Sequence, residues 1–180
     1  MLIDDLMPEF EFGDAHKIEV NARREAVFRA VKTFDMAEST TIRWLFKMRG
    51  IPTENLTIND FDRVNFKILA ENPNEEVVLG LVGDFKGLTS GLLKIEPQNF
   101  CTFDQPGFIK AVWNFAVAET NAKKSRVATE IRIYPTDENS RAKVKTYWSM
   151  MRPPMAMITK EILKLIKKQA ESAAKQKRSN

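Results

Sequence analysis

The sequence has very few of the side chains from which metal centres are built. Its 180 residues include one cysteine and one histidine. The lone Cys101 excludes an internal disulfide and a zinc site of several cysteines, and the lone His16 excludes a site built on a histidine pair. We therefore expect no metal and no cofactor, and a single reduced thiol is typical of a cytoplasmic protein.

Long apolar runs are also missing. No stretch of about 18 consecutive apolar residues occurs, so we expect no transmembrane segment. The N-terminal sequence MLIDDLMPEF is acidic and lacks the basic and then apolar segments of a signal peptide. Because there is no repeat and no low-complexity linker, we expect one domain over residues 1–180, with a core at about residues 10–172 and a basic tail at residues 173–180.

Positive charge is concentrated at one end of the chain. Of the 28 basic and 24 acidic side chains, residues 160–180 hold seven and two, which leaves 21 and 22 in residues 1–159. A basic tail can bind nucleic acid or anionic lipid, and it can equally be a solvated helix end. No aromatic residue lies among these lysines, so we expect no nucleic acid partner.

Hydrophobic periodicity predicts an α+β fold. Residues 10–20 alternate as a half-buried strand does, and helical spacing follows. From residue 65 the apolar residues recur at every second position, as in strands, until a long helical region begins near residue 137. We expect consecutive strands in an antiparallel meander, with the helices gathered on one face. The helix candidates are residues 24–34, 39–50 and 137–175 with a short turn at 58–62, and the later strand candidates are residues 65–71, 76–84, 91–96, 108–119 and 124–134.

Several segments resemble one known superfamily. They are HKIEVNARREAVFRAV, VVLGLVGDF, GFIKAVWNFAV, TEIRIYP and SRAKVKTYW. Together they resemble the helix-grip superfamily, which comprises START, polyketide-cyclase and birch-pollen-allergen-like proteins and is also called SRPBCC, in an uncharacterised prokaryotic branch. The resemblance implies a curved antiparallel sheet wrapped around a long C-terminal helix, with an apolar cavity between them. Members bind lipids, sterols or polyketide-like molecules, and some catalyse cyclisation or dehydration.

The last two predicted strands each have a clearly apolar face. Trp113 and Phe115 lie on this face of the first, where they fit plain core packing and, in a helix-grip protein, fit a cavity wall equally well. Thr129 supplies the one hydroxyl on this face of the second, and it could fix the polar group of a ligand. Glu130 and Arg132 are expected to pair on the opposite face, where an ion pair contributes little.

His16 has two interpretations. Its place on the apolar side of the first strand turns it toward the covered side of the sheet. It fits a structural histidine at the rim of the cavity, and it also fits a polar anchor or a general base, because imidazole exchanges protons near neutral pH. No motif supports a catalytic pair of His16 with Cys101. Asp84 and Glu119 are carboxylates at strand ends, and nothing in the sequence brings them together.

Four glycines in GLVGDFKGLTSG invite comparison with a phosphate-binding loop. The segment has neither G-x-G-x-x-G nor a Gly-Lys pair followed by Ser or Thr, so we exclude that function. Glycines within strands are typical of bulges and sharp curvature. We therefore expect a structural role for Gly80, Gly83, Gly87 and Gly91.

The longest predicted helix contains two adjacent prolines, Pro153 and Pro154. They lack the amides that would bond the carbonyls of Ser149 and Met150, and an interior proline costs about 3 kcal/mol. The apolar spacing continues across them, and burial of one apolar side chain stabilises by roughly 1.5–3 kcal/mol. We expect one helix with a kink near residues 152–154 that follows a curved sheet. The residues of this apolar face are Val144, Trp148, Met151, Met155, Ile158, Ile162 and Leu165.

Aromatic residues and methionines on these faces favour binding of a hydrophobic or amphipathic small molecule that is lipid-like or polyketide-like. Methionine adapts its shape to its partner, and four of the eight methionines lie in residues 150–157. The alternatives are a cyclase- or dehydratase-like enzyme on the same scaffold and an interaction module that uses the basic tail. No catalytic residue is assigned. The expected ligand-binding residues are Trp113, Phe115, Thr129, Trp148, Met151, Met155 and His16.

Overall fold

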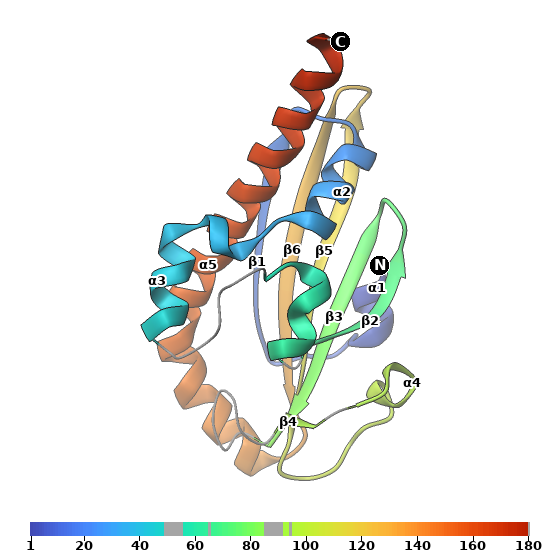
Figure 1. The fold of residues 1–180 in the computed structure, drawn as a ribbon. Helices are drawn as coiled ribbons and strands as arrows, with labels where there is room; N and C mark the ends of the chain where they lie inside the picture. Colours follow the sequence, from blue (N-terminus) through green and yellow to red (C-terminus); the bar gives the residue numbers. More distant parts are fainter. Residues whose placement is uncertain (49–55, 65, 85–91, 94, 180) are drawn as a thin grey trace.

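A computed structural model describes residues 1–48, 56–64, 66–84, 92–93 and 95–179. Its elements include those of the predicted α+β order, together with short helices that the sequence did not predict (Figure 1). The helices are α1 Leu2–Leu6, α2 Arg24–Thr33, α3 Thr40–Met48, α4 Pro97–Phe100 and α5 Glu138–Ser179, with two short 3-10 helices, η1 Met36–Glu38 and η2 Ile58–Val64. The strands are β1 Phe12–Val20, β2 Lys67–Asn72, β3 Glu76–Gly83, β4 Leu92–Leu93, β5 Ile109–Asn121 and β6 Lys124–Pro135.

The strands form one antiparallel sheet in the order β1-β6-β5-β3-β2. The predicted meander is wrong in one place, because β5 pairs along the whole of β3 instead of following β4. β4 pairs only with the end of β3, next to β2 on the same edge. The chain therefore crosses to the other edge of β3 before β5 begins, and α4 lies in that crossing.

The inner face of the sheet is the face covered by α2 and α5. Its core contains apolar side chains from β3, β5 and β6, as the alternation of the sequence predicted. α2 buries its apolar stripe here, with Val27 and Val31 fully covered. The main cluster extends from Val20 on β1 to Ala170 on α5. Most of the apolar area that stabilises the fold is therefore buried between this face and the helices.

α5 is a single helix with both prolines inside it, and it bends along its length as Figure 1 shows, so the predicted single, bent helix is confirmed. The position of the kink near residues 152–154 stays a prediction. Pro153, Ser149 and Met150 are exposed, which places the two carbonyls that lack amide partners on a side of the helix that water reaches. Beyond Ile162 the buried positions are Leu163, Ile166 and Ala170, and Leu165 is partly buried against the main core. Leu165 therefore packs against the core as the sequence predicted, and the sequence analysis missed the more deeply buried Leu163 and Ile166 beside it. The described part of the tail, residues 173–179, continues α5.

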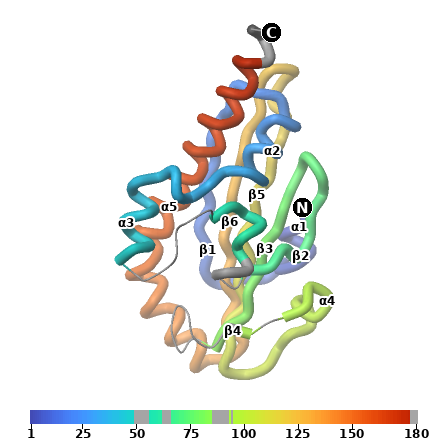
Figure 2. Tube along the Cα trace, viewed as in Figure 1, coloured from blue at the N-terminus to red at the C-terminus, as the bar shows by residue number. Residues whose placement is uncertain are grey.

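The outer face of the sheet carries two short helices, and the expectation that all helices lie on one face was wrong. α1 lies behind the sheet when α2 is in front of it (Figure 2), and its Ile3 is fully buried. α4 brings Phe100 to the same apolar cluster. The buried members of this outer cluster are Ile3, Met7, Val78, Val82, Ile95, Phe100 and Val112.

A buried carboxylate attaches α1 to the sheet. Glu76 on β3 accepts hydrogen bonds from the amides of Leu2 at 2.7 Å and Ile3 at 3.3 Å. Asn114 on β5 donates its side-chain amide to the same carboxylate at 2.7 Å. The first amides of a helix have no partner within the helix, so Glu76 acts as their cap from another element.

Arg132 on β6 holds the same helix from a second side. Its guanidinium donates to Asp4 at 2.7 Å, to the carbonyl of Met7 at 2.9 Å and to Glu130 at 2.8 Å. The predicted pairing with Glu130 is confirmed, but Arg132 is only 8% exposed, so it is more than a surface ion pair. The bond from Arg132 lowers the pKa of Asp4 below its ordinary value.

Gly80 leaves room for the packing of the outer face. A Cβ at this position would lie 2.3 Å from a methyl carbon of Leu69 and 3.2 Å from the ring of Phe100. The register of β2 shifts next to Leu69, which agrees with the irregular sheet that the glycines indicated. Gly87 and Gly91 lie outside the described residues, as does the predicted turn at residues 85–88.

The helices of the described residues do not meet the requirements of a membrane-spanning helix. Among the described residues, no helix combines the length and the apolar composition that are needed to cross a bilayer.

Candidate functional site

An aromatic cluster occupies the centre of the inner face. Trp113 and Phe115 lie on β5 with ring centroids 5.2 Å apart. Phe61 of η2 stacks on Trp113 at 5.8 Å, and Phe66 meets the same ring edge-on at 6.2 Å. Phe34, which follows α2, packs on Phe115 at 5.9 Å. Phe34, Phe61 and Phe66 were not predicted as neighbours of these rings, since they lie outside the strands whose faces the sequence allowed us to compare.

The polar atoms beside these rings are bonded to one another. Thr129 Oγ1 accepts a hydrogen bond from Trp113 Nε1 at 2.7 Å and donates one to the carbonyl of Asn114 at 2.6 Å. Thr129 is 1% exposed and Trp113 is 5% exposed. These bonds fix the tilt of the indole ring. A role for Trp113, Phe115 and Thr129 in holding a ligand stays a prediction.

Three polar side chains meet where β1 faces α5. His16 Nε2 lies 2.7 Å from Asp14 Oδ2 on the same side of β1. Arg152 of α5 donates to the other oxygen of Asp14, Oδ1, at 3.2 Å. His16 and Asp14 are mostly covered, at 18% and 12% exposed, whereas Arg152 is 59% exposed. We call Asp14, His16 and Arg152 the rim triad.

The register of the sheet places the rim triad relative to the aromatic cluster. His16 pairs with Thr129, which pairs with Phe115, and Asp14 pairs with Ile131. Neighbouring strands are about 4.8 Å apart, so His16 and Phe115 lie in one row about 10 Å apart on the inner face. β1 is an edge strand, so the polar end of this row is at the rim of the sheet.

The residues of α5 that were selected from the sequence lie around Arg152. Met151 is buried at 4% exposed, and Met155 is partly buried against the main core. Trp148 packs against both the main core and the smaller cluster formed by Ala111, Ile133 and Val144. Met150 and Met157, by contrast, are exposed. The turn of α5 next to the rim triad is therefore apolar toward the sheet.

The rim triad has a defined chemistry. Because Asp14 accepts, Nε2 of a neutral His16 carries the proton and Nδ1 is left with a lone pair. Within the described part of the chain Nδ1 has no hydrogen-bond partner, so it can accept from a hydroxyl group. Arg152 uses only some of its five donors on Asp14. The group can thus accept a proton at one point and bind an anion or carbonyl at another.

Other pairings that the sequence left open are excluded. Cys101 follows α4 on the outer face and His16 is on the inner face, so they cannot form a catalytic pair. Asp84 and Glu119 lie at opposite ends of the sheet, because Gly83 pairs with Ile109 at the start of β5. Among the described residues, no group of three or more His, Cys, Asp and Glu side chains is placed to hold a metal ion.

Two members of the rim triad were not predicted from the sequence. Asp14 carried a readable signal, because it stands two residues before His16 and a strand places such residues on one face. Arg152 carried none, since its partner Asp14 lies 138 residues away along the chain.

Comparison with known proteins finds solved structures of similar fold and no similar family or curated sequence. No family model matches the chain, and no curated protein sequence is similar to it. A conserved protein from Geobacillus kaustophilus has a TM-score of 0.48 at 11% identity over 90% of this chain and 97% of its own. The Zhui aromatase/cyclase from a Streptomyces species has a TM-score of 0.35 at 11% identity over 89% and 93%. The protein TTHA0849 from Thermus thermophilus has a TM-score of 0.35 at 9% identity over 90% and 99%. With TM-scores below 0.5, none of these similarities supports a function for this chain.

Proposed function

We propose that this chain binds an amphipathic small molecule between the inner face of the sheet and α5. The observation that carries the proposal is the rim triad, a polar and partly exposed group at the edge of an otherwise apolar face. Ligand sites are typically apolar surfaces with a few polar groups that fix orientation. The resemblance of the sequence to the helix-grip superfamily favours a lipid-like or polyketide-like ligand.

The rim triad determines the polar end of that ligand. Arg152 can donate to a carboxylate or carbonyl with the donors that Asp14 does not occupy. His16 Nδ1 can accept from a hydroxyl next to it. A hydroxyl adjacent to a carboxylate or carbonyl satisfies both residues at once, and this arrangement is common in aromatic polyketides and hydroxy acids.

The apolar body of the ligand would contact α5 and the inner wall. Trp148, Met151 and Met155 flank Arg152 on α5, and methionine adapts to ligands of different shape. Trp113 and Phe115 lie further along the same face. Each square ångström of apolar surface that is buried contributes about 25 cal/mol before the cost of ordering the ligand.

Binding of matched probes tests the proposal. 3-Hydroxy-2-naphthoate has the adjacent hydroxyl and carboxylate, 2-naphthoate lacks the hydroxyl, and 2-naphthol lacks the carboxylate. We expect 3-hydroxy-2-naphthoate to bind about tenfold more tightly than either, since one good polar contact to a charged group is worth about 1.5 kcal/mol. Quenching of tryptophan fluorescence and calorimetry measure the three affinities.

Two variants assign the polar contacts. In Arg152→Gln, 3-hydroxy-2-naphthoate should bind no more tightly than 2-naphthol, which lacks the carboxylate. In His16→Gln, it should bind no more tightly than 2-naphthoate, which lacks the hydroxyl. Arg141→Gln is the matched control, because Arg141 is on the same helix and pairs with Glu11 near β1. Equal affinities for the three probes, or equal losses in Arg141→Gln and Arg152→Gln, would contradict the proposal.

A cyclase- or dehydratase-like enzyme is the second candidate. The 2.7 Å contact of His16 with Asp14 favours it, because a carboxylate that orients an imidazole leaves the other nitrogen as a general base. Small molecules that co-purify with the chain, identified by denaturing mass spectrometry, supply the substrates to assay. His16→Gln should abolish turnover while the substrate still binds, although more weakly where the hydroxyl contact is lost. Unchanged turnover in this variant would exclude His16 as the base, and a chain that turns over none of these molecules would be a carrier.

A further inference from the structure

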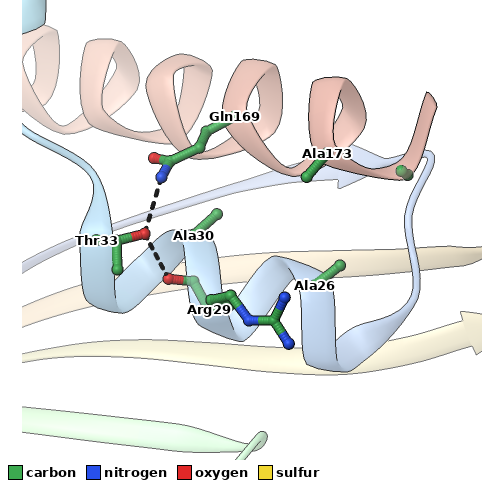
Figure 3. A pocket seen from close by; sticks show the side chains of 7 residues that line it. Ala26, Arg29, Ala30, Thr33, Gln169 and Ala173 are labelled. Carbon is green, nitrogen blue, oxygen red and sulfur yellow. Dashed lines mark hydrogen bonds between the residues drawn. The ribbon is translucent and has the colours of Figure 1, made fainter. Parts of the chain in front are cut away.

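A second concave surface lies between α2 and the end of α5, away from the rim triad. Figure 3 shows α2 and α5 side by side there, with Ala26 and Ala30 facing Ala173. The space between them measures about 80 Å³ and is mostly apolar. At one end Gln169 donates to Thr33 Oγ1 at 2.8 Å, which ties the two helices together. We call this space the alanine pocket.

A wider groove continues from the alanine pocket. It measures about 470 Å³ and shares Ala26, Arg29 and Ala174 with the pocket. Arg29 extends along α2 toward Ala26, so its guanidinium lies where the two spaces meet (Figure 3). The groove also reaches the turn between β5 and β6 at Lys123. Its lining residues are Ala22, Arg23, Glu25, Ala26, Arg29, Lys123 and Ala174.

The cations of this groove are not neutralised by the protein. Within the residues that the structure describes, the side chains of Arg23, Arg29 and Lys123 have no ion pair and no hydrogen bond. Cations next to the groove are paired: Arg24 with Glu75 and Arg126 with Glu19. The three cations that line the groove therefore keep their donors free for a ligand.

The groove has a positive potential from two sources. Three cations and the single carboxylate of Glu25 give its lining a net charge of +2. α2 begins at Arg24, and its N-cap residue Arg23 provides no side-chain acceptor to the first turn. The positive end of the helix dipole therefore adds to the charge of the side chains.

We propose that this groove binds an oxyanion, phosphate or carboxylate, carried on a short apolar group. Arg23, Arg29 and Lys123 bind the anion, because guanidinium groups donate in pairs to such oxygens and lysine adds a point charge. The alanine pocket takes the apolar group, and its volume of about 80 Å³ admits only a few carbon atoms. A short-chain phosphate ester or fatty acid has this chemistry, whereas a long lipid does not fit.

The site is independent of the rim triad. None of its lining residues belongs to the inner-face site, and α2 and the turn at Lys123 supply most of them. Loss of binding at one site therefore leaves the other unaffected, so the proposed function and this inference succeed or fail separately.

Butyl phosphate is the probe, with inorganic phosphate, pentanoate and butan-1-ol as comparators. In a titration followed by amide NMR, butyl phosphate should shift the amides of residues 22–30 and 167–174 and leave those of His16 and Arg152 unchanged. Inorganic phosphate should bind about tenfold more weakly, because it leaves the alanine pocket empty. Pentanoate distinguishes a carboxylate from a phosphate as the preferred anion, and butan-1-ol should not bind.

Substitutions assign the two halves of the site. Arg29→Gln and Lys123→Gln should each weaken butyl phosphate about tenfold. Arg126→Gln, which removes a paired arginine nearby, is the matched control and should change nothing. Ala26→Leu fills the alanine pocket and should make butyl phosphate bind no better than inorganic phosphate, and Ala174→Leu repeats this test from α5 if the first variant unfolds.

Three results would overturn the inference. They are the absence of localised shifts with all three anions, shifts spread over all basic surfaces, and equal losses of affinity in Arg29→Gln and Arg126→Gln.

Discussion

The two faces of the sheet are stabilised in different ways. The inner face buries a large apolar cluster under α2 and α5, and its polar atoms, such as Thr129 and Trp113, bond to one another. The outer face buries a smaller cluster under α1 and α4 together with three charged side chains. These are Glu76, Lys110 and Arg132, which are 5%, 9% and 8% exposed.

This difference shows what a short helix needs in order to dock. A five-residue helix such as α1 buries too little apolar area to hold its place and is too short to be stable alone. Glu76 and Arg132 supply directional bonds that specify its position. Lys110 is held similarly, by the carbonyl of Cys101 and the rings of Phe100 and Tyr134, and burial lowers its pKa. The inner face is stabilised mainly by the apolar area that it buries, and the outer face depends on directional bonds to buried charged side chains.

The largest effect is expected at the inner face. Phe115→Ala should lower the free energy of unfolding by about 3–5 kcal/mol, because Phe115 is fully buried among other rings and a cavity would remain. Urea denaturation measures the change. Trp44→Ala, at a side chain that is 61% exposed, is the control and should change stability by about 0.5 kcal/mol or less. A loss in Phe115→Ala no greater than that of a typical surface substitution would remove the distinction between the faces.

A smaller effect is expected when the cap of α1 is removed. Glu76→Gln should cost about 1–3 kcal/mol, because it leaves amides of α1 and the side chain of Asn114 poorly bonded. Hydrogen exchange at Leu2 and Ile3 should accelerate. Glu75→Gln replaces the neighbouring carboxylate, which is 50% exposed, and should leave both measurements unchanged. Slow exchange at Ile3 in Glu76→Gln would show that apolar contact alone holds α1.

The polar pair of the inner face should contribute about 1 kcal/mol. A double-mutant cycle with Thr129→Val and Trp113→Phe isolates the bond between Thr129 Oγ1 and Trp113 Nε1. Thr129→Val keeps the shape of the side chain, whereas Trp113→Phe removes part of the buried indole. The packing loss of Trp113→Phe occurs with and without Thr129→Val and cancels in the cycle, so the coupling energy from urea unfolding reports the hydrogen bond. A coupling energy near zero would mean that packing alone orients the indole.

The smallest effect concerns pH. The pKa of Asp4 is lowered by its bond from Arg132, so Asp4 stabilises the fold above its ordinary pKa of 3.8, and this contribution is lost as pH falls through the lower folded value. Asp4→Asn should therefore lower the midpoint of unfolding at neutral pH and have no effect at the acid end. Asp5→Asn, on the same helix, is the control. If the midpoint of unfolding depended on pH equally in the two variants, the bond between Asp4 and Arg132 would not stabilise the docking of α1.

Local periodicity was sufficient to predict most of the fold. β5 and β6 alternate so regularly that both faces were assigned from the sequence, including the outward pair of Glu130 and Arg132. The kinked helix was predicted because its apolar spacing continues through Pro153 and Pro154. In both cases the signal is contained within a single element.

The elements that were missed depend on distant partners. The residues of α1 have no helical period, and their helix is completed by Glu76, 74 residues away from Leu2. α4 comprises the four residues PQNF, which are equally compatible with a turn. The candidate site divides in the same way, because Asp14 could be assigned to the face of His16 and Arg152 could not be assigned to Asp14.

The prolines of α5 have a consequence for its unfolding. Val144 before them packs in the cluster with Ala111 and Ile133, whereas the residues from Ile158 onward pack with α2 in the main core. The ladder of backbone bonds is interrupted between these two parts, so each can open without forcing the other to open. We expect the amides of α5 to exchange in two groups with different free energies, divided at residues 153–154, which themselves have no amide proton to exchange.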